Sequence, residues 1–193
     1  MKRSLGPTER LYPMPTPLVV GGSGSDVSVL PVAWIAIAGS TPSSIVMAVR
    51  STRHTLSLIR ASGEFTVNVP SVSLAEAVDY CGIVSGRATD KFADTGLTAV
   101  PATQVATPII EQCPLNLECK VLSEVPNGDY VLVIGEIVET LADEAILTED
   151  GKVDVDKLDP LVYIPGTREY RGLGPKVADA FKIGRGVAKK GAE

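Results

Sequence analysis

Residues 115–140 read LNLECKVLSEVPNGDYVLVIGEIVET, and this stretch decides the fold class. It holds two β-rich segments, 115–124 and 130–140, separated by Pro-Asn-Gly-Asp at 126–129. Asn-Gly between two apolar segments is the strongest short-range signal for a tight turn joining antiparallel strands. Polar and apolar residues alternate along the first segment, whereas the second is apolar on both sides. We therefore expect an antiparallel hairpin whose second strand is buried on both faces.

Other short β-rich segments lie on both sides of this hairpin, and the helical signals are few and short. Strands are predicted at 17–21, 27–38, 44–49, 65–69, 109–111 and 161–164. Helices are predicted at 55–62, ending at Gly63, at 74–80, with Ser73 and Glu76 forming a capping box, and as one turn at 90–93. A doubly wound parallel sheet needs long helices between its strands, and these are missing. The pattern indicates a mainly β protein, an antiparallel, Greek-key-like barrel with a few short helices.

Composition sets limits on organisation and on partners. The 193 residues are predicted to form a single domain, 1–193, with an N-terminal arm at 1–16 and a basic, Gly-rich tail at 175–193. A net charge of -5 makes nucleic acid a poor partner, because its phosphates favour a basic surface. The chain has no apolar run long enough to span a membrane and no secretory signal at its start, so we expect a cytoplasmic protein.

The cysteine and histidine content argues against a metal site. Cys81, Cys113 and Cys119 form no CxxC pair, and His54 is the only histidine. An odd number of unpaired cysteines is typical of free thiols in a reducing compartment. We therefore predict neither a disulfide framework nor a bound metal.

Residues 50–70, RSTRHTLSLIRASGEFTVNVP, place several cations and hydroxyls around one strand end. Thr55 is predicted to begin a helix, and the positive end of a helix favours a phosphate dianion. Arg50, Ser51, Thr52 and Arg53 lie in the same turn, and arginine can bind phosphate with two parallel hydrogen bonds. Two alternatives stay open: Thr55 as a plain helix cap, and Arg53 as a solvated surface charge.

A second polar stretch, SGRATDKF at 85–92, has the composition of a loop that lines a ligand. Ser85 and Gly86 offer a flexible turn. Lys91 offers a cation, at the edge of a flat ring or at a phosphate, unless it is simply solvated. Phe92 is expected to be the more buried of the pair Lys91 and Phe92. His54 is expected to be a structural donor beside the phosphate turn rather than a general base.

Taken together, these segments resemble the flavin reductase-like, FMN-binding split-barrel family, and within it the flavoredoxin group. The matching pieces, in order, are LYPMPTPLVVGG at 11–22, AW at 33–34, RSTRHT at 50–55, GEFTVNVPS at 63–71, DYCGIVSGRATDKFADTGL at 79–97, LECK at 117–120, IGEIVET at 134–140 and LVYIPGTREYRGLG at 161–174. The resemblance implies a split β-barrel homodimer that binds FMN non-covalently. It departs from the family where Asn-x-x-Thr often precedes the tryptophan, since Ser28 and Pro31 stand there instead.

Carried over position by position, the resemblance places Trp34 and Tyr163 near the ring. For Trp34 a plain core position is the alternative, and for Asn68 a solvent-facing one. Tyr12 and Tyr170 are further aromatics that could close over the ring. The candidate cofactor-binding residues are Trp34, Arg50, Ser51, Thr52, Arg53, His54, Thr55, Asn68, Ser85, Gly86, Lys91, Phe92 and Tyr163.

The function implied by the resemblance is redox chemistry on FMN, with no catalytic side chain. In the first hypothesis the chain passes electrons through a bound FMN, with a redox protein such as ferredoxin as partner. In the alternative it is an NAD(P)H-dependent flavin or ferric reductase in which FMN exchanges as a substrate. The chain lacks a GxGxxG motif, so any nicotinamide would have to stack directly on the flavin.

Overall fold

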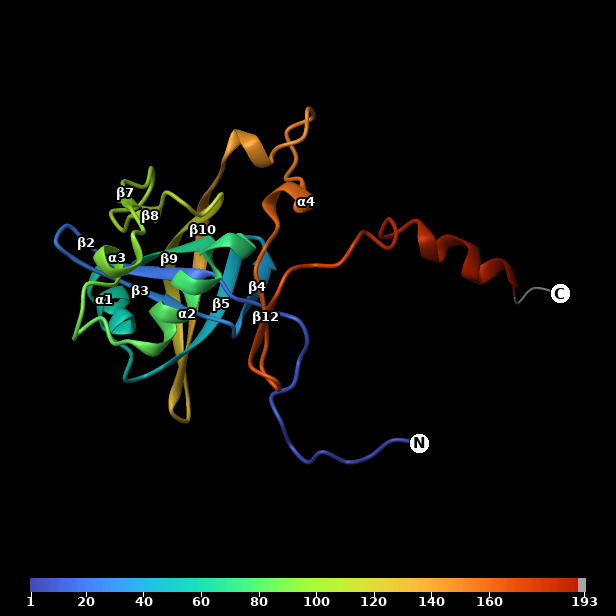
Figure 1. Ribbon diagram of the computed structural model, residues 1–193, viewed down its shortest axis with the longest axis horizontal. Helices are drawn as coiled ribbons and strands as arrows, with labels where there is room; N and C mark the ends of the chain where they lie inside the picture. Colours follow the sequence, from blue (N-terminus) through green and yellow to red (C-terminus); the bar gives the residue numbers. More distant parts are fainter. Residues whose placement is uncertain (191–193) are drawn as a thin grey trace.

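A computed structural model, which describes residues 1–190, is built around one seven-stranded antiparallel sheet (Figure 1). The strand order is β3-β2-β6-β9-β10-β5-β4. The strands are β2 (Leu18–Ser23), β3 (Asp26–Pro31), β4 (Ile35–Ser40), β5 (Ser43–Arg50), β6 (Glu64–Val69), β9 (Leu115–Asn127) and β10 (Tyr130–Ala142). Three hairpins, β2–β3, β4–β5 and β9–β10, supply six of the seven strands. The mainly β, antiparallel fold class predicted from the sequence is confirmed.

Smaller elements cover this sheet. Strands β1 (Met14–Pro15), β11 (Val162–Ile164) and β12 (Glu169–Arg171) form a three-stranded sheet, and β7 (Ala99–Val100) pairs with β8 (Ile109–Ile110). The α-helices are α1 (His54–Ser62), α2 (Ala75–Ile83), α3 (Lys91–Thr95) and α4 (Val155–Leu158). Short 3₁₀ turns are η1 (Val72–Leu74), η2 (Glu144–Ile146) and η3 (Ile183–Lys190).

The predicted hairpin forms and is longer than expected. Strands β9 and β10 have 13 residues each and are joined by a tight turn at Gly128 and Asp129. Gly128 has a φ of 58°, which a residue without a Cβ adopts at little cost. Val131 and Val133 are buried, but the alternate residues Leu132 and Ile134 are only half-buried. The prediction that β10 is buried on both faces was therefore only half right.

The single strand predicted over 27–38 is wrong, because the chain forms two strands there at opposite edges of the sheet. Strand β3 ends at Pro31, which has no N–H to continue a ladder. The Val32 N–H instead donates to the Pro17 carbonyl at 3.0 Å, and β4 begins at Ile35. The short link at 32–34 thus carries Trp34 from one sheet edge to the other.

The predicted capping box at Ser73 and Glu76 does not form. Ser73 lies inside η1, and α2 begins at Ala75 after Leu74, which makes no side-chain cap. The Ser73 hydroxyl pairs with the Ser71 hydroxyl at 2.6 Å instead. Ser and Thr side chains can bond within a local turn as well as cap a helix. Here Ser73 bonds within the 3₁₀ turn η1 and so does not cap α2.

Alternation along the strands divides the core into two clusters. Val19 of β2 packs with α1 and the central strands, whereas its neighbours Leu18 and Val20 pack with α2 and the 97–113 segment. Helix α1 comes close to β2 because Gly21 leaves room: a Cβ there would lie 2.6 Å from Ile59 Cγ1. This packing presents the N-terminal end of α1 at one side of the sheet.

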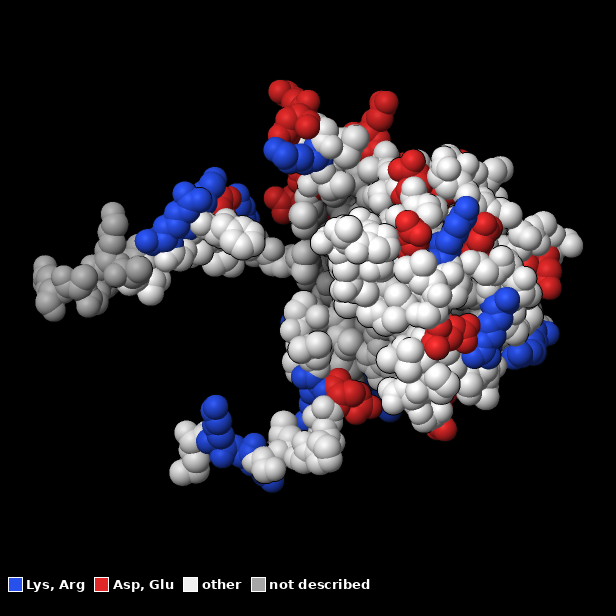
Figure 2. Space-filling model, turned by 180° about the vertical axis from the view of Figure 1, so that it is seen from behind, with Lys and Arg blue, Asp and Glu red and all other residues white. Residues whose placement is uncertain are grey.

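The terminal segments project from the body (Figure 1). Figure 2 shows Lys and Arg side chains along both of these arms and acidic side chains gathered over the α4 region. Over the body in this view the two signs of charge are mixed. This face therefore carries no broad basic patch of the kind that nucleic acid requires.

Candidate functional site: an open helix end beside an aromatic groove

The N-terminus of α1 is open to an anion. Arg53 occupies the cap position in an extended conformation, and no side chain accepts a hydrogen bond from the first-turn amides. The Thr55 hydroxyl, expected at the phosphate or as a cap, is buried and donates to the Ser28 hydroxyl at 3.1 Å. The amides of the first turn thus remain available, and the helix dipole makes them favour negative charge.

Three arginines come from the segments next to this helix end. Arg50 lies over the Tyr130 ring, 5.1 Å from its centroid, and the Arg53 N–H donates to the Arg50 carbonyl at 3.0 Å. Arg87 reaches across from the 85–90 loop and donates to the Thr52 carbonyl at 3.1 Å. Within residues 1–190, none of the three forms an ion pair with a carboxylate. Their positive charge is therefore not neutralised by the chain, and it adds to that of the helix end.

An aromatic groove begins next to these cations. The Trp34 and Tyr130 rings lie 4.9 Å apart between centroids, with 56° between their planes. A hollow of about 140 Å³ lies against both rings and is also lined by the 30–33 segment, Arg50 and Arg53. The pairing of β10 with β5 sets this arrangement, because it puts Tyr130 directly opposite Arg50. The Trp34 and Tyr130 rings thus give this groove a flat apolar wall next to Arg50 and Arg53.

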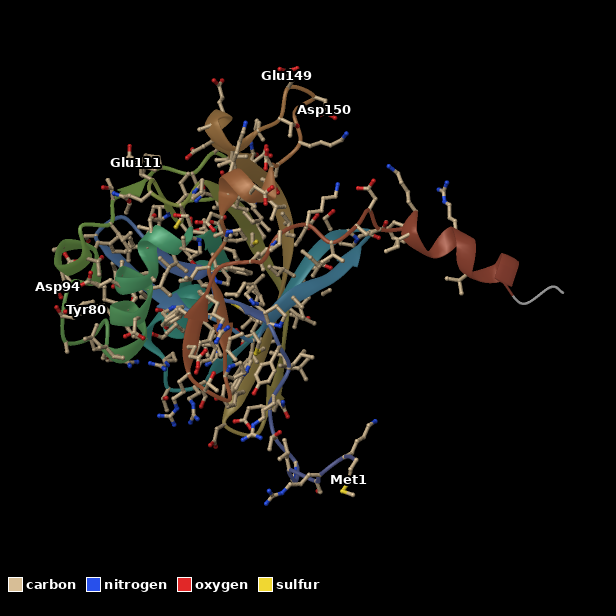
Figure 3. All side chains as sticks on the ribbon, turned by 45° about the vertical axis from the view of Figure 1, so that its right-hand side comes forward. Met1, Tyr80, Asp94, Glu111, Glu149 and Asp150 are labelled. Carbon is tan, nitrogen blue, oxygen red and sulfur yellow. The ribbon has the colours of Figure 1, made fainter. Side chains whose placement is uncertain are left out.

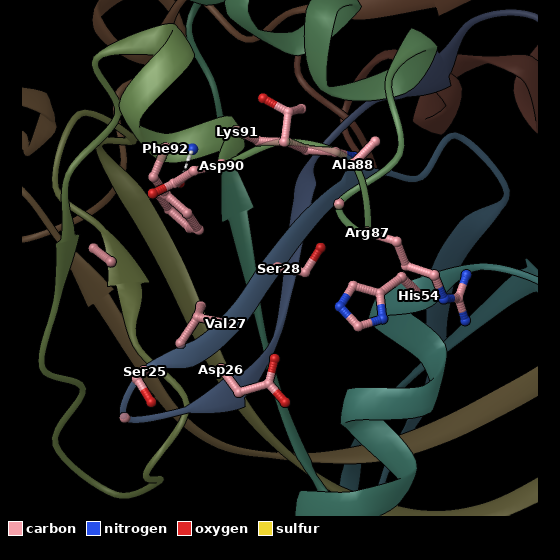
Figure 4. Close-up of a pocket in the computed structure, with 14 residues that line it drawn as sticks. Ser25, Asp26, Val27, Ser28, His54, Arg87, Ala88, Asp90, Lys91 and Phe92 are labelled. Carbon is pink, nitrogen blue, oxygen red and sulfur yellow. Dashed lines mark hydrogen bonds between the residues drawn. The ribbon is translucent and has the colours of Figure 1, made fainter.

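A larger polar hollow, of about 560 Å³, lies on the other side of His54 (Figure 4). In Figure 4 the His54 ring faces the hollow beside Arg87 and opposite Ser28, and Asp26 lies below them. His54 Nδ1 lies 3.4 Å from the Ser57 hydroxyl, and that hydroxyl donates to the His54 carbonyl at 2.6 Å. These contacts belong to the first turn of α1. The expectation that His54 is a structural residue of the phosphate turn stays a prediction.

Gly86 has a steric role in this hollow. A Cβ at Gly86 would collide with the Ser28 hydroxyl and lie 3.4 Å from the His54 ring. A larger residue at this position would therefore force the Ser28 hydroxyl or the 85–90 loop to move. Ser28 is thereby placed between Thr55 and Gly86.

Lys91 is buried, and Phe92 is the more exposed of the two, so the predicted order was wrong. Lys91 Nζ donates to the Cys81 carbonyl at 2.6 Å and to the Val29 carbonyl at 2.9 Å. Burial lowers the pKa of Lys91 below its usual value of 10.5, and the charge of Arg53 adds to that lowering. The solvated-charge alternative is excluded, and the ammonium joins β3 to α2 along the wall of the hollow.

Asn68 belongs to an internal network and has no exposed surface. Its amide group donates to the Leu18 carbonyl and the Thr66 hydroxyl, and its oxygen accepts from the Ile110 N–H and from Asn116. The solvent-facing alternative is therefore wrong. Because every polar atom of the side chain is already bonded, we leave Asn68 out of the proposed site.

Tyr163 lies in a third hollow, of about 470 Å³, which also contacts Trp34. Its ring packs on Tyr170, with centroids 5.6 Å apart. The Tyr170 hydroxyl donates to Asp79 at 3.1 Å, and burial first, then the Asp79 charge, raises the pKa of Tyr170 to about 12. Ser51, Thr52 and Ser85 are exposed and line none of these three hollows.

Two residues of the site were missed from the sequence. Arg87 stands inside the quoted SGRATDKF stretch, and its charge beside a Ser-Gly turn was a usable signal. Tyr130 follows the Asn-Gly turn, and nothing in the neighbouring sequence indicates that it lies at the site. Only the strand register brings it to Arg50 and Trp34.

An open helix end among unneutralised arginines, next to an aromatic groove, has the chemistry that a class of protein needs to hold a phosphate-bearing molecule with a flat ring. Comparison with known proteins identifies that class: residues 10–174 match the model of the flavin reductase like domain. The chain therefore belongs to the flavin reductase-like family, as predicted from the sequence, and its role is a flavin-related redox function.

Individual proteins agree with this assignment. Flavoredoxin of Desulfovibrio vulgaris (Miyazaki F) is 36% identical and superposes with a TM-score of 0.91, covering 96% of this chain and 100% of that chain. Flavoredoxin from Methanosarcina acetivorans is 28% identical, with a TM-score of 0.91 and coverage of 97% and 99%. An uncharacterised protein of Archaeoglobus fulgidus is 36% identical over 148 residues, 77% of this chain and 82% of that protein. The split-barrel prediction is confirmed, because a solved flavin reductase structure with a split barrel domain, from Shewanella frigidimarina NCIMB 400, superposes with a TM-score of 0.78 at 23% identity, covering 87% of this chain and 85% of that chain.

Residues 1–190 hold neither a membrane-spanning helix nor a cluster of metal-binding side chains. No helix among them is long and apolar enough to cross a membrane. No group of three or more His, Cys, Asp or Glu side chains among them could hold a metal ion.

Proposed function

We propose that the flavin is FMN and that its phosphate binds at the N-terminus of α1. FMN ends in a phosphate dianion, which suits first-turn amides combined with the Arg50 and Arg53 guanidiniums. The groove beside Trp34 and Tyr130 then takes the ring. The observation that carries this proposal is the uncapped helix end among arginines without carboxylate partners in the described residues.

The residues of the site have distinct tasks in this proposal. Arg50, held over the Tyr130 ring, and Arg53 bind and orient the phosphate. Arg87 fixes the turn by its bond to the Thr52 carbonyl. Trp34 and Tyr130 form a wall that limits water at the ring. Bound FMN supplies the electron-transfer chemistry itself, so no side chain is needed as acid or base.

The identity of the flavin is tested by release from purified protein. We expect a yellow protein that yields FMN, and no FAD, when it is denatured and the flavin is separated by chromatography. Colourless protein that takes up neither FMN nor FAD when each is added would disprove the proposal. Release of FAD would show that the site continues beyond one phosphate.

The position of the phosphate is tested by charge removal. Arg50→Gln combined with Arg53→Gln should weaken FMN binding at least tenfold, since a hydrogen bond to a charged group contributes about 1.5–3 kcal/mol. Arg60→Gln is the matched control, because Arg60 lies in the last turn of the same helix and pairs with Glu124 at 2.8 Å. Equal losses in the control would mean that general charge, and not this turn, attracts the phosphate.

We further propose that the chain passes electrons through a bound FMN, with a redox protein as partner. The similarity to two flavoredoxins supports this reading. The hollow beside Trp34 and Tyr163 supports the alternative of an NAD(P)H-dependent reductase, because it leaves room for a second small reactant. Anaerobic mixing separates the two: rapid bleaching by NADH or NADPH indicates the reductase, and bleaching by reduced ferredoxin alone indicates the carrier.

A homodimer is also proposed, as the family resemblance implies. An apolar groove of about 400 Å³ beside β4, lined by Ile35, Ile37 and Ile45 among others, supports it. Ile37 is 67% exposed, which is unusual for a large apolar side chain next to an apolar groove. Light scattering after gel filtration measures the mass, and we expect Ile37→Asp to shift it from dimer to monomer.

A further inference from the structure

The C-terminal tail, residues 175–190, exposes apolar side chains that the body of the chain does not cover. Val177 and Phe181 are 94% and 92% exposed, and Ile183 is 70% exposed. The tail leaves the body and runs away from it (Figure 1). The family match ends at residue 174, so the tail lies beyond the matched domain. Large apolar side chains that gather on one exposed segment indicate a surface that binds another molecule.

The same tail carries positive charge. Lys176, Lys182 and Arg185 stand among the apolar residues, and Asp179 is the one acidic residue of the tail. Asp179 pairs with Lys176 at 2.6 Å and with Lys182 at 3.1 Å, whereas Arg185 forms no ion pair within the described residues. One carboxylate does not neutralise three cations. The tail therefore combines apolar contact surface with a net positive charge.

The apolar groove of about 400 Å³ beside β4, here called the β4 groove, suits the apolar side chains of the tail. Among the described residues that line it, Thr16 alone is polar. The lining extends from Ile35 and Ile37 of β4 to residues 160–162, which follow α4. An apolar side chain that entered this groove would lose its contact with water, which favours binding.

Acidic side chains border the β4 groove where it meets α4. Residues 143–159, here called the acidic segment, hold seven Asp or Glu residues and two lysines. The acidic segment directly precedes Pro160 of the groove lining, and Figure 2 shows its acidic side chains gathered over the α4 region. Val153 and Val155 of this segment are also exposed. The surface beside the groove thus has the charge opposite to that of the tail.

The tail begins beside this acidic segment. A Cβ on Gly172 would lie 3.4 Å from Oδ1 of Asp159. The hydrogen bond to Asp179 raises the pKa of Lys176 most, and the charge of Asp156 adds to that rise. The start of the tail, the acidic segment and the end of the β4 groove therefore lie close together. A two-fold contact between copies at this place would bring each tail to the other copy's groove.

We propose that the tail of one copy docks in the β4 groove of a second copy, with Phe181 in the groove and Lys182 and Arg185 against the acidic segment. This contact rests on the proposed homodimer and names the segment that holds the two copies together. A second copy is the partner because this one chain carries both halves of the contact, matched in charge and in apolar surface. Exchange of a terminal segment between identical chains is a low-cost route to a dimer.

Thiol cross-linking identifies which chain supplies the tail. The three native cysteines are buried, so the accessible thiols are those introduced by Phe181→Cys in one protein and by Ile37→Cys in another. After the two proteins are mixed, oxidised glutathione should produce a covalent heterodimer on a non-reducing gel. Leu5→Cys, on the other terminal arm, replaces Phe181→Cys in the control and should give much less. The proposal is overturned if Phe181→Cys and Ile37→Cys on one chain close into a cross-linked monomer, or if Ile37→Cys links mainly to itself.

The contribution of Phe181 is measured by sedimentation of the full-length protein. Phe181→Asp should weaken the dimer by about tenfold or more, because it removes a buried phenyl ring from the contact. Leu5→Asp is the matched control, since Leu5 is an exposed apolar residue of the other arm, and it should leave the dimer unchanged. A parent protein that is monomeric would disprove the homodimer itself. A dimeric parent that Phe181→Asp does not weaken would disprove only the tail contact.

Charge reversal tests the acidic segment as the second part of the contact. Lys182→Glu combined with Arg185→Glu should weaken the dimer about fivefold at low salt, and the loss should shrink at high salt. Lys2→Glu combined with Arg3→Glu changes the net charge equally on the other arm and should have little effect. If both pairs of substitutions weaken the dimer to the same extent, overall charge explains the result and the docking of the tail is disproved.

Discussion

Trp34 and Tyr130 lie 4.9 Å apart, although 96 positions separate them in the chain, and Arg50 lies over the same Tyr130 ring. Trp34 comes from the link between two strands at opposite sheet edges, and Tyr130 from the first position of β10. The three side chains join the anion site to the aromatic groove. Tyr130 therefore connects the two halves of the proposed cofactor site.

Removing the Tyr130 ring should weaken FMN binding. Tyr130→Leu takes away the ring that holds Arg50 and Trp34, and cation–ring contacts at exposed sites contribute about 0.5–1 kcal/mol. We expect a loss of affinity of about threefold to tenfold, measured by quenching of FMN fluorescence. Tyr80→Phe is the control, because Tyr80 of α2 bonds to Asp94 at 2.7 Å (Figure 3) and does not line the groove. Unchanged affinity in Tyr130→Leu would remove Tyr130 from the site.

Lys91 should make stability depend on alkaline pH. Its pKa in the folded protein is lowered by burial, so the unfolded chain binds more protons between that lowered pKa and 10.5. The contribution of Lys91 to the free energy of unfolding should therefore rise with pH across that window. Lys91→Met should lose this contribution, so the parent should gain stability relative to the variant as the pH rises toward about 10. Urea denaturation of both proteins, at neutral and alkaline pH, measures the difference; a constant difference would show that Lys91 keeps an ordinary pKa.

The three cysteines should be unreactive in the folded protein. Burial raises the pKa of the Cys81 thiol to about 11 and the pKa values of Cys113 and Cys119 to about 12 each. Thiolate is the reactive form, so little of it is present near neutral pH. We expect almost no reaction with Ellman's reagent at mildly alkaline pH, and three thiols per chain after denaturation. Because these pKa values lie above the usual 9.0, the thiols also cost stability as the pH rises past 9. Rapid labelling of even one native thiol would contradict the burial described for it.

Glu118 should be among the most important residues for stability. Its fully buried carboxylate accepts from the Thr103 and Val105 N–H groups, at 2.8 and 3.2 Å, and also from the Thr103 hydroxyl and the Gln104 N–H. Glu118→Gln replaces an acceptor oxygen by an N–H₂ donor, which leaves donors facing each other. We expect a loss of about 3 kcal/mol in the free energy of unfolding, measured by urea denaturation. Glu149→Gln, on the exposed loop labelled in Figure 3, should change it by less than about 0.5 kcal/mol.

The sequence predicted the hairpin and the end of α1 well because both depend on neighbouring residues. Asn-Gly between apolar segments selects an antiparallel hairpin, and the β9–β10 turn lies where that signal stands. The end of α1 at Gly63, in the left-handed conformation, also agrees with the prediction. By contrast, the break after Pro31 was missed. β-branched residues on both sides of Pro31 favour one continuous strand, although Pro31 has no N–H to donate to a strand ladder.

The burial of Lys91 and Asn68 was beyond the reach of the sequence. A lysine in a polar loop is usually solvated, but the Val29 and Cys81 carbonyls, from β3 and α2, converge on this one. Asn68 looks like an outward-facing polar residue in an alternating strand, but the 108–116 segment covers that face. In both cases the partner atoms are distant in the chain, so no local pattern reveals them.

By itself, the sequence determined the mainly β class, the position of the hairpin, the cationic turn at 50–55 and the resemblance to the flavin reductase-like family, because these follow from local propensity and from the order of motifs. The tertiary structure decided which aromatic ring meets which arginine. The β10–β5 register puts Tyr130 opposite Arg50, and the link after Pro31 brings Trp34 to both. Strand register is set by packing over the whole sheet, and a shift of one residue would turn Tyr130 to the other face.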